Sequence, residues 1–169
     1  MSFPLALGVG AESLDEVMEF ELGDWLATSE IHRRLDGQLP RGLRVMKVES
    51  ADPRTKAQVS SLEYRVKVRG VDPAELERRV EGFRQSPEVL VRAERKGEVT
   101  ELDLKESVAD LERSGPDLVF EIDATGRKVP RPEFVLKGLG FDPDAHPEAF
   151  GITRTRVNLV GPLQPRGRA

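Results

Sequence analysis

The sequence predicts an α+β protein in which two strand, helix, strand patterns follow one another. The first pattern lies in residues 17–49 and the second in residues 118–160, with a further strand and helix between them. In each pattern, hydrophobic residues recur with period two, then with a helical period, then with period two again. The 169 residues, 38% of them hydrophobic, suffice for one domain with a core or for two small packed halves.

Residues 1–49 are expected to form an incomplete first half. Residues 1–10 are apolar and interrupted by proline and glycine, and we expect a strand joined in the middle of a sheet. An alternating strand is predicted over residues 17–22, and Asp24 is placed to cap a helix that ends at Pro40. Residues 43–49 return to a strand. The apolar positions of the helix are spaced by four: Ala27, Ile31, Leu35 and Leu39.

The clearest strand follows a polar joint at residues 51–56. Its inward positions are Leu62, Tyr64, Val66 and Val68, and its outward positions are Glu63, Arg65, Lys67 and Arg69. Asp72 and Pro73 then begin a helix, because aspartate is a preferred cap and proline fits the first helical position. A hairpin turning at Lys96-Gly97 follows, and a short helix is predicted over residues 105–113.

The last strand, helix, strand pattern completes the second half. An alternating strand covers residues 118–122, Pro132 opens a short helix, and a strand covers residues 152–160. Residues 59–160 therefore have the element order of the ferredoxin-like split β-α-β unit, with an inserted hairpin arm and short helix. The predicted fold is a tandem pair of ferredoxin-like halves with antiparallel sheets. The expected divisions are residues 1–50, residues 57–160 and a flexible tail at residues 161–169.

Composition excludes several kinds of chemistry. The chain has no cysteine, which rules out disulfides, thiolate nucleophiles, cysteine-ligated zinc and iron–sulfur clusters. It has no apolar run long enough for a membrane span, and the apolar opening lacks the basic flank of a signal peptide. We therefore expect a cytoplasmic protein with no membrane partner. No phosphate loop, paired-carboxylate signature or metal-ligand spacing is present, so no catalytic residue, metal or cofactor is predicted.

The net charge of −4 argues against a generally basic nucleic-acid binder, but the charge is uneven. Residues 1–30 carry seven acids and no lysine or arginine, whereas residues 151–169 carry four arginines and no acid. Such ends can pair with each other or bind a partner, and the sequence leaves both readings open.

Basic residues supply the candidate binding surfaces. Because the last strand of a ferredoxin-like sheet lies beside the first, we expect one basic strand face that could bind phosphate. Its expected members are Arg65, Lys67, Arg69, Arg154 and Arg156. A solvated face with cross-strand ion pairs is the competing interpretation. The second candidate surface combines Arg92 and Lys96 of the hairpin arm with Arg131 before the last helix.

Five segments, in the same order, resemble the radical-SAM-linked domain family of bacteria. They are Leu39-Pro40-Arg41-Gly42-Leu43-Arg44-Val45, Leu62-Glu63-Tyr64-Arg65-Val66, the hairpin with Arg92, Lys96-Gly97 and Asp103-Leu104, Arg131-Pro132-Glu133, and Arg154-Thr155. The resemblance implies an N-terminally shortened member, because the family carries a strand, an arginine-rich helix and a glycine- and histidine-containing segment before this point. It also implies a neighbouring or fused radical SAM protein.

A radical SAM enzyme needs three cysteines on one cluster, so a chain without cysteine is expected to be a companion of that enzyme. The first functional hypothesis is a non-catalytic accessory or substrate-binding module, in a process such as RNA modification. One alternative is a stand-alone RNA-binding or RNA-processing protein. The other is a structural or interaction protein whose acidic and basic ends self-associate. A homo-oligomer formed through an unpaired sheet edge is a further expectation.

Overall fold

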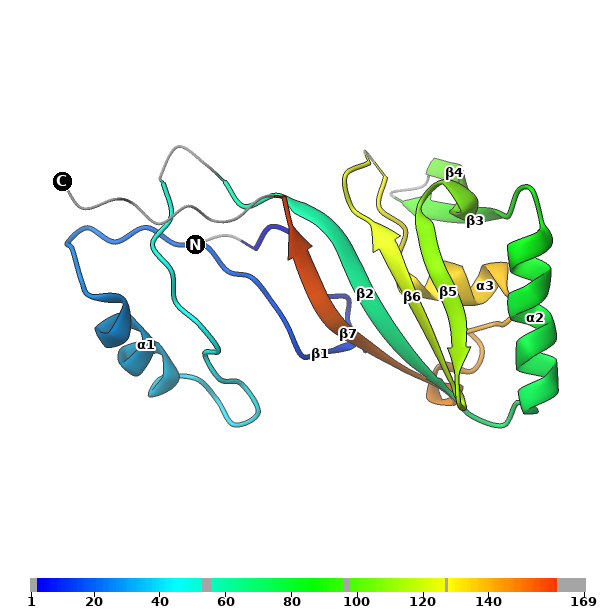
Figure 1. Ribbon diagram of the computed structural model, residues 1–169, viewed down its shortest axis with the longest axis horizontal. Coiled ribbons are helices and arrows are strands. Elements are labelled where there is room, and N and C mark those ends of the chain that lie inside the picture. The colour runs from blue at the N-terminus through cyan, green and yellow to red at the C-terminus, as the bar shows by residue number, and fades with distance from the viewer. Residues whose placement is uncertain (1–2, 53–55, 96–97, 127, 161–169) are drawn as a thin grey trace. The chain divides into compact units, whose positions relative to one another are not determined.

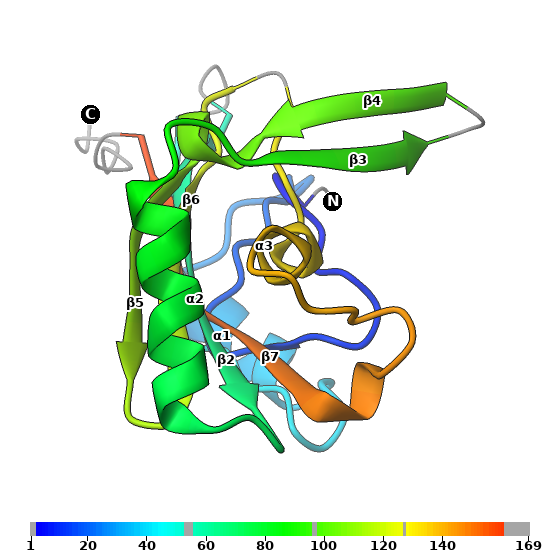
Figure 2. The same ribbon diagram turned by 90° about the vertical axis from the view of Figure 1, so that its right-hand side faces the viewer.

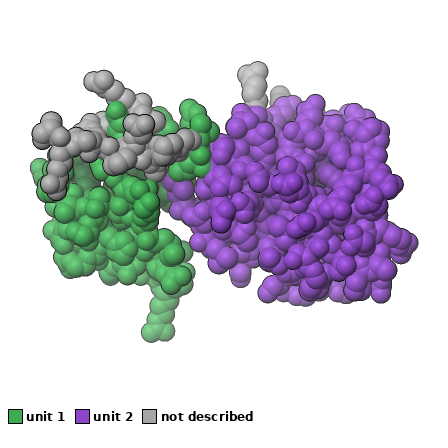
Figure 3. Space-filling model, in the orientation of Figure 1, with its two compact units in different colours: residues 1–4, 18–58, 159–169 green, residues 5–17, 59–158 purple. Residues whose placement is uncertain are grey.

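The computed structural model describes residues 3–52, 56–95, 98–126 and 128–160 (Figure 1). Over these residues the fold is α+β, with three α-helices, a five-stranded mixed sheet and a separate two-stranded sheet. The chain divides into two compact units (Figure 3). Unit 1 consists of Met1–Pro4, Met18–Gln58 and Leu159–Ala169, and unit 2 of Leu5–Val17 and Val59–Asn158.

The sheet of unit 2 has the order β1-β7-β2-β6-β5. Its strands are β1 (Glu12–Ser13), β2 (Val59–Val68), β5 (Val108–Ser114), β6 (Asp117–Asp123) and β7 (Phe150–Leu159). The β2–β6 and β5–β6 pairs are antiparallel, and β1 runs parallel to β7. Between β2 and β7, Arg69 N donates to Ala149 O and Thr155 Oγ1 donates to Glu63 O, which gives an antiparallel pair. A tandem ferredoxin-like arrangement is not confirmed.

Two helices lie on one side of this sheet, α2 (Pro73–Gln85) and α3 (Pro132–Gly138) (Figure 2). As predicted, α2 is capped by Asp72, whose carboxylate accepts hydrogen bonds from Ala74 N and Glu75 N. The core lies between the helices and the sheet. Its fully buried side chains are Leu62, Val66, Leu76, Val80, Leu104, Leu118, Phe120, Ile122, Val135 and Leu136.

The predicted hairpin is confirmed as β3 (Leu90–Arg95) and β4 (Glu98–Asp103), while its turn, residues 96–97, lies outside the described residues. A 3-10 turn over Leu104–Glu106 follows, and a second over Pro147–Ala149 precedes β7. Leu104 is fully buried and approaches α3 closely. A Cβ atom added to Gly138 would lie 2.6 Å from Cδ1 of Leu104. The base of the hairpin is thus anchored on α3.

The predicted helix at residues 105–113 is wrong, because residues 108–114 form the edge strand β5. A register shift between Ala109 and Glu112 interrupts the β5–β6 ladder, and Asp110 lies in the left-handed region with φ 50°. The bulge turns Leu111 into the core and places Val108, three residues earlier, against it. A spacing of three between inward residues imitates a helix, which explains the error.

Unit 1 also departs from the prediction. Its helix α1 spans Thr28–Asp36, so it begins after Ala27 instead of at Asp24, and no side chain caps it. The predicted strands at residues 17–22 and 43–49 do not form: Glu19 makes an isolated bridge, and residues 43–49 have no regular structure. Among the residues that the structure describes, all the buried hydrophobic ones belong to unit 2. No described helix is both long and apolar enough to cross a membrane.

Candidate functional site

A buried arginine is the centre of a polar cluster in unit 2. Arg154 of β7 is 2% exposed, and its five N–H groups all have acceptors. Nε and Nη2 each donate to the hydroxyl of Tyr64 at 3.2 Å, and Nη1 donates to Oε1 of Glu16 at 2.8 Å. The carbonyls of Leu5 and Ala6 accept the remaining bonds at 3.2 and 3.5 Å. An arginine so fully occupied serves as an anchor and has no N–H left for a ligand.

The segment that Arg154 holds is Leu5–Val17, which also contacts the rest of unit 2 through β1 and through Leu5 and Ala11, whose side chains pack against the core. Leu14 N donates to Arg154 O at 2.9 Å, and Oδ2 of Asp15 accepts from Val157 N at 2.9 Å. The Glu16–Arg154 ion pair also joins the acidic start of the chain to its arginine-containing end. The pairing of the two ends that the sequence left open therefore occurs at Arg154.

The phenol and a second carboxylate complete the cluster. Burial raises the pKa of Tyr64, while the Arg154 guanidinium lowers it and the negative charges of Glu133 and Glu16 raise it further. Tyr64 is therefore a neutral hydroxyl at physiological pH. Oε2 of Glu133 is buried and has no hydrogen-bond partner among the described residues. Tyr64, Glu133 and Arg154 come from three of the segments that carry the family resemblance.

The expected basic strand face is only partly formed. Arg65 and Lys67 are exposed on the outer face of β2, and Nη1 of Arg69 donates to Glu148 O. Arg154, expected on the same face, is instead buried beside Tyr64, because the inward positions of β7 are Ile152 and Arg154. That placement was wrong, although β7 does lie beside β2 as predicted.

Carboxylates interrupt the basic face. Nη1 of Arg65 pairs with Oδ2 of Asp117 at 3.1 Å, and Asp117 is also the register partner of Lys67. Glu63 and Glu121 are register partners four positions along the ladder from Lys67 and Asp117. Cross-strand ion pairs, the competing interpretation from the sequence, are therefore present on this face.

The other candidate residues lie at separate places. Arg156 is exposed and pairs with Glu63 at 3.5 Å, and Arg92 on the hairpin pairs with Glu101 at 3.4 Å. Arg131 is the exposed N-cap residue of α3 and makes no side-chain cap bond. Lys96 lies outside the described residues. Across the described chain, no group of three acidic or histidine residues is arranged to hold a metal ion.

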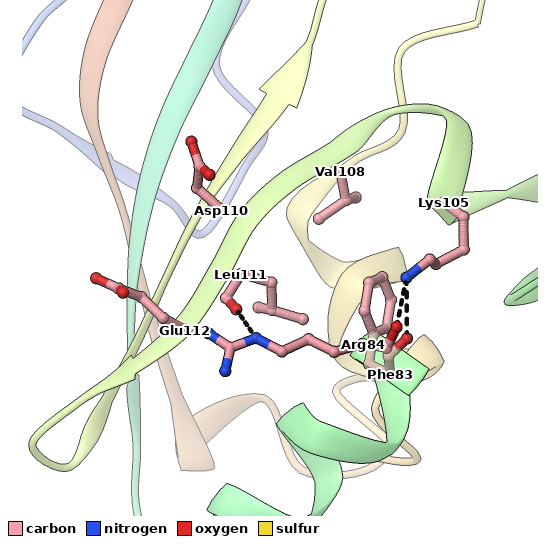
Figure 4. A pocket seen from close by; sticks show the side chains of 7 residues that line it. All are labelled: Phe83, Arg84, Lys105, Val108, Asp110, Leu111 and Glu112. Atoms are coloured by element: carbon pink, nitrogen blue, oxygen red, sulfur yellow. Dashed lines mark hydrogen bonds between the residues drawn. The ribbon is translucent and has the colours of Figure 1, made fainter. Parts of the chain in front are cut away.

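Sequence reasoning missed a cavity of about 530 Å³ between the end of α2 and β5 (Figure 4). Nζ of Lys105 donates to Phe83 O and Arg84 O at 3.2 and 3.1 Å, and so satisfies carbonyls at the end of α2. Nε of Arg84 donates to Leu111 O at 2.9 Å. Asp110 lines the same cavity. Sequence reasoning did not find this cavity because it assigned residues 105–113, which include much of the lining, to a helix.

The left-handed conformation of Asp110 yields a first prediction. Replacing Asp110 with valine should lower the free energy of unfolding by about 1–2 kcal/mol, because a β-branched residue is strained at positive φ. Asp110→Gly should be neutral or stabilising, since glycine adopts this conformation freely. Urea unfolding followed by circular dichroism measures both. Glu112→Val, two residues along the strand, is the control, and equal losses for the two valine variants would contradict the prediction.

With this geometry established, comparison with known proteins places the chain. Residues 1–131 match a family described as uncharacterized proteins conserved in bacteria, DUF2344. The chain belongs to this family. No curated protein and no solved structure matches it. In this DUF2344 protein, the matched residues include Tyr64, the hairpin arm and Asp110, whereas Arg154 lies beyond them. The Tyr64–Arg154 contact thus joins the matched part to the rest of the protein.

Proposed function

We propose that the protein is a non-catalytic accessory module that binds a radical SAM protein in the cytoplasm. The absence of cysteine from the chain means that any iron–sulfur cluster would belong to the partner. The partner's class rests on the resemblance of the five sequence segments to radical-SAM-linked proteins. The observation that carries a binding role is the β3–β4 arm.

The arm is fixed at its base and exposed beyond it. At the base, Oδ1 of Asp103 accepts hydrogen bonds from Val89 N and Lys105 N, both at 3.0 Å. Further along, Val99 is 65% exposed, and the side chains of Arg92 and Glu101 are 80% and 56% exposed. Figure 2 shows the arm extending past α3. Neither strand has a second neighbour among the described strands. Because β3 packs against α3, the outer edge of β4 is the one that can accept a partner's strand.

The finer fold is part of the same proposal. We propose that β2, α2, β5, β6, α3 and β7 form one ferredoxin-like unit, with the β3–β4 arm inserted before its second strand. The order β7-β2-β6-β5 supports this assignment. The arm is then an insertion into a common framework, and function often resides in such insertions.

Co-purification tests the proposal. The tagged full chain should co-purify with a cysteine-containing radical SAM protein under anaerobic conditions. Val99→Lys, which removes an exposed apolar side chain from the arm, should weaken their association by about tenfold or more. Leu14→Lys is the matched control, since Leu14 is 71% exposed elsewhere in unit 2. No association, or equal weakening by both variants, would count against the proposal.

RNA binding is the alternative outcome. The carboxylates beside Arg65 and Lys67 reduce the support for it, since phosphate binding needs a positive surface. RNA affinity that falls with salt and is lost in Arg65→Glu/Lys67→Glu would favour RNA over the radical SAM protein. Arg154 is unsuitable for this test, because its replacement would disturb the buried cluster.

A further inference from the structure

Unit 1 lacks a core of its own. None of its described residues is buried, and the apolar positions of α1, Ile31 and Leu35, are only partly covered. Burial of apolar surface is the main favourable contribution to folding. A segment of this length that buries no side chain completely is therefore expected to gain stability by covering its apolar residues in an assembly.

Two strips of unit 1 combine exposed apolar residues with charge. The acidic strip, residues 21–25, carries Glu21 and Asp24 together with Leu22 and Trp25, which are 47% and 88% exposed. The basic strip, residues 41–46, carries Arg41 and Arg44 together with Leu43 and Met46, which are 62% and 68% exposed. Each strip thus offers large apolar side chains flanked by charges of one sign, a combination suited to an interface.

The charged side chains of the two strips are not paired within unit 1, unlike several charged side chains near them in the sequence. Glu30 pairs with Arg33 and Arg34, which lower its pKa to about 2, and Lys47 pairs with Glu49. By contrast, the side chains of the strips make no hydrogen bond or ion pair with another described residue. These are Glu21, Asp24, Arg41 and Arg44. The unpaired charges of the two strips are therefore of both signs and lie beside exposed apolar residues.

We infer that the two strips form an interface with a second copy of this chain, the acidic strip of each copy meeting the basic strip of the other. A twofold interface requires a surface that is complementary to itself, because residue i of one copy contacts residue j of the other and the reverse. One acidic and one basic strip on the same unit meet that requirement. A partner surface of a single sign would attract one strip and repel the other. This inference does not rest on the proposed function, which uses the hairpin arm.

The association should be visible with the full chain. Sedimentation velocity should show a dimer at low salt that dissociates as salt rises, because salt screens exposed charges. Trp25 is the only tryptophan, so its fluorescence reports on the acidic strip directly. Its emission should shift to shorter wavelength as the dimer forms and Trp25 leaves water. A chain that stays monomeric at high micromolar concentration and low salt would overturn the inference.

Charge reversal on each strip provides a test that misfolding cannot imitate. Glu21→Lys/Asp24→Lys makes both strips basic, and Arg41→Glu/Arg44→Glu makes both acidic. Each variant alone should dimerise at least about tenfold more weakly than the natural chain. An equimolar mixture should form a heterodimer, because every contact then joins opposite charges. Failure of the mixture to associate would contradict the inference, as would undiminished dimerisation of either variant alone.

A matched control separates the strips from the overall charge. Lys67→Glu/Lys128→Glu changes the net charge as much as Arg41→Glu/Arg44→Glu does, but at exposed positions of unit 2. This variant should dimerise like the natural chain. An equal loss of dimer in the control would assign the effect to net charge and overturn the role of the strips.

Discussion

Replacing Arg154 with methionine is expected to lower the free energy of unfolding by about 3–5 kcal/mol, because its buried guanidinium satisfies a carboxylate, a hydroxyl and two carbonyls at once. Methionine approximates the length of the stem but donates no hydrogen bond. Glu16 would lose its cation at 2.8 Å, and the Tyr64 hydroxyl would lose both donors. The carbonyls of Leu5 and Ala6 would lose theirs as well, so the segment Leu5–Val17 would be released first.

The matched control lies two residues away on the same strand. Arg156 pairs with Glu63 at 3.5 Å, but its side chain is 63% exposed, so Arg156→Met should change stability by no more than about 1 kcal/mol. Urea unfolding followed by far-ultraviolet circular dichroism measures both variants. Equal losses would show that Arg154 contributes no more than a surface ion pair. A double-mutant cycle with Tyr64→Phe then isolates the coupling between the two side chains.

Replacing Phe120 with alanine is expected to cost about 3–5 kcal/mol, the range for deleting a buried phenylalanine ring. Phe120 is 1% exposed on β6, between β2 and β5, and its ring stacks on Tyr64 with centroids 5.7 Å apart. The cavity would therefore open in the middle of the core and leave the Tyr64 ring unsupported. This loss includes the stacking contact in addition to the buried area.

Phe3→Ala is the control for this second prediction. Phe3 is 52% exposed, so its removal should change stability by about 0.5 kcal/mol or less. Circular dichroism is the suitable probe, because the only tryptophan lies in unit 1 and would not follow the core of unit 2. If Phe120→Ala and Phe3→Ala unfold at the same urea concentration, the core assignment of Phe120 is wrong.

Local chemistry explains which elements of unit 2 could be predicted. The alternation of Leu62, Tyr64 and Val66 matches one buried face, and Asp72 with Pro73 begins α2 as expected. Strand β5 could not be found this way, because its bulge at Asp110 replaces the period of two. In unit 1, strand-like alternation at residues 17–22 and 43–49 was insufficient, since a strand forms only where a neighbouring strand accepts its backbone hydrogen bonds.

The candidate site was less predictable for the same kind of reason. The positions of the arginines could be read from the chain, and the exposure of Arg65 and Lys67 followed from the alternation in β2. The burial of Arg154 depends on Leu5, Ala6 and Glu16, which lie more than 130 residues away in sequence. The one local signal was that Arg154 shares the parity of the apolar Ile152. That signal is insufficient, because Arg156 has the same parity and is exposed.

The position of β7 sets the order in which the protein can assemble. Its neighbours, β1 and β2, are both synthesised long before it, yet β7 lies between them in the sheet. While the chain is still on the ribosome, β1 has no strand to pair with and one edge of β2 stays open. Closure of the sheet must wait for residues 150–159, and contacts so distant in sequence form slowly. A chain that stops before β7 would thus present two unpaired edges and is expected to aggregate.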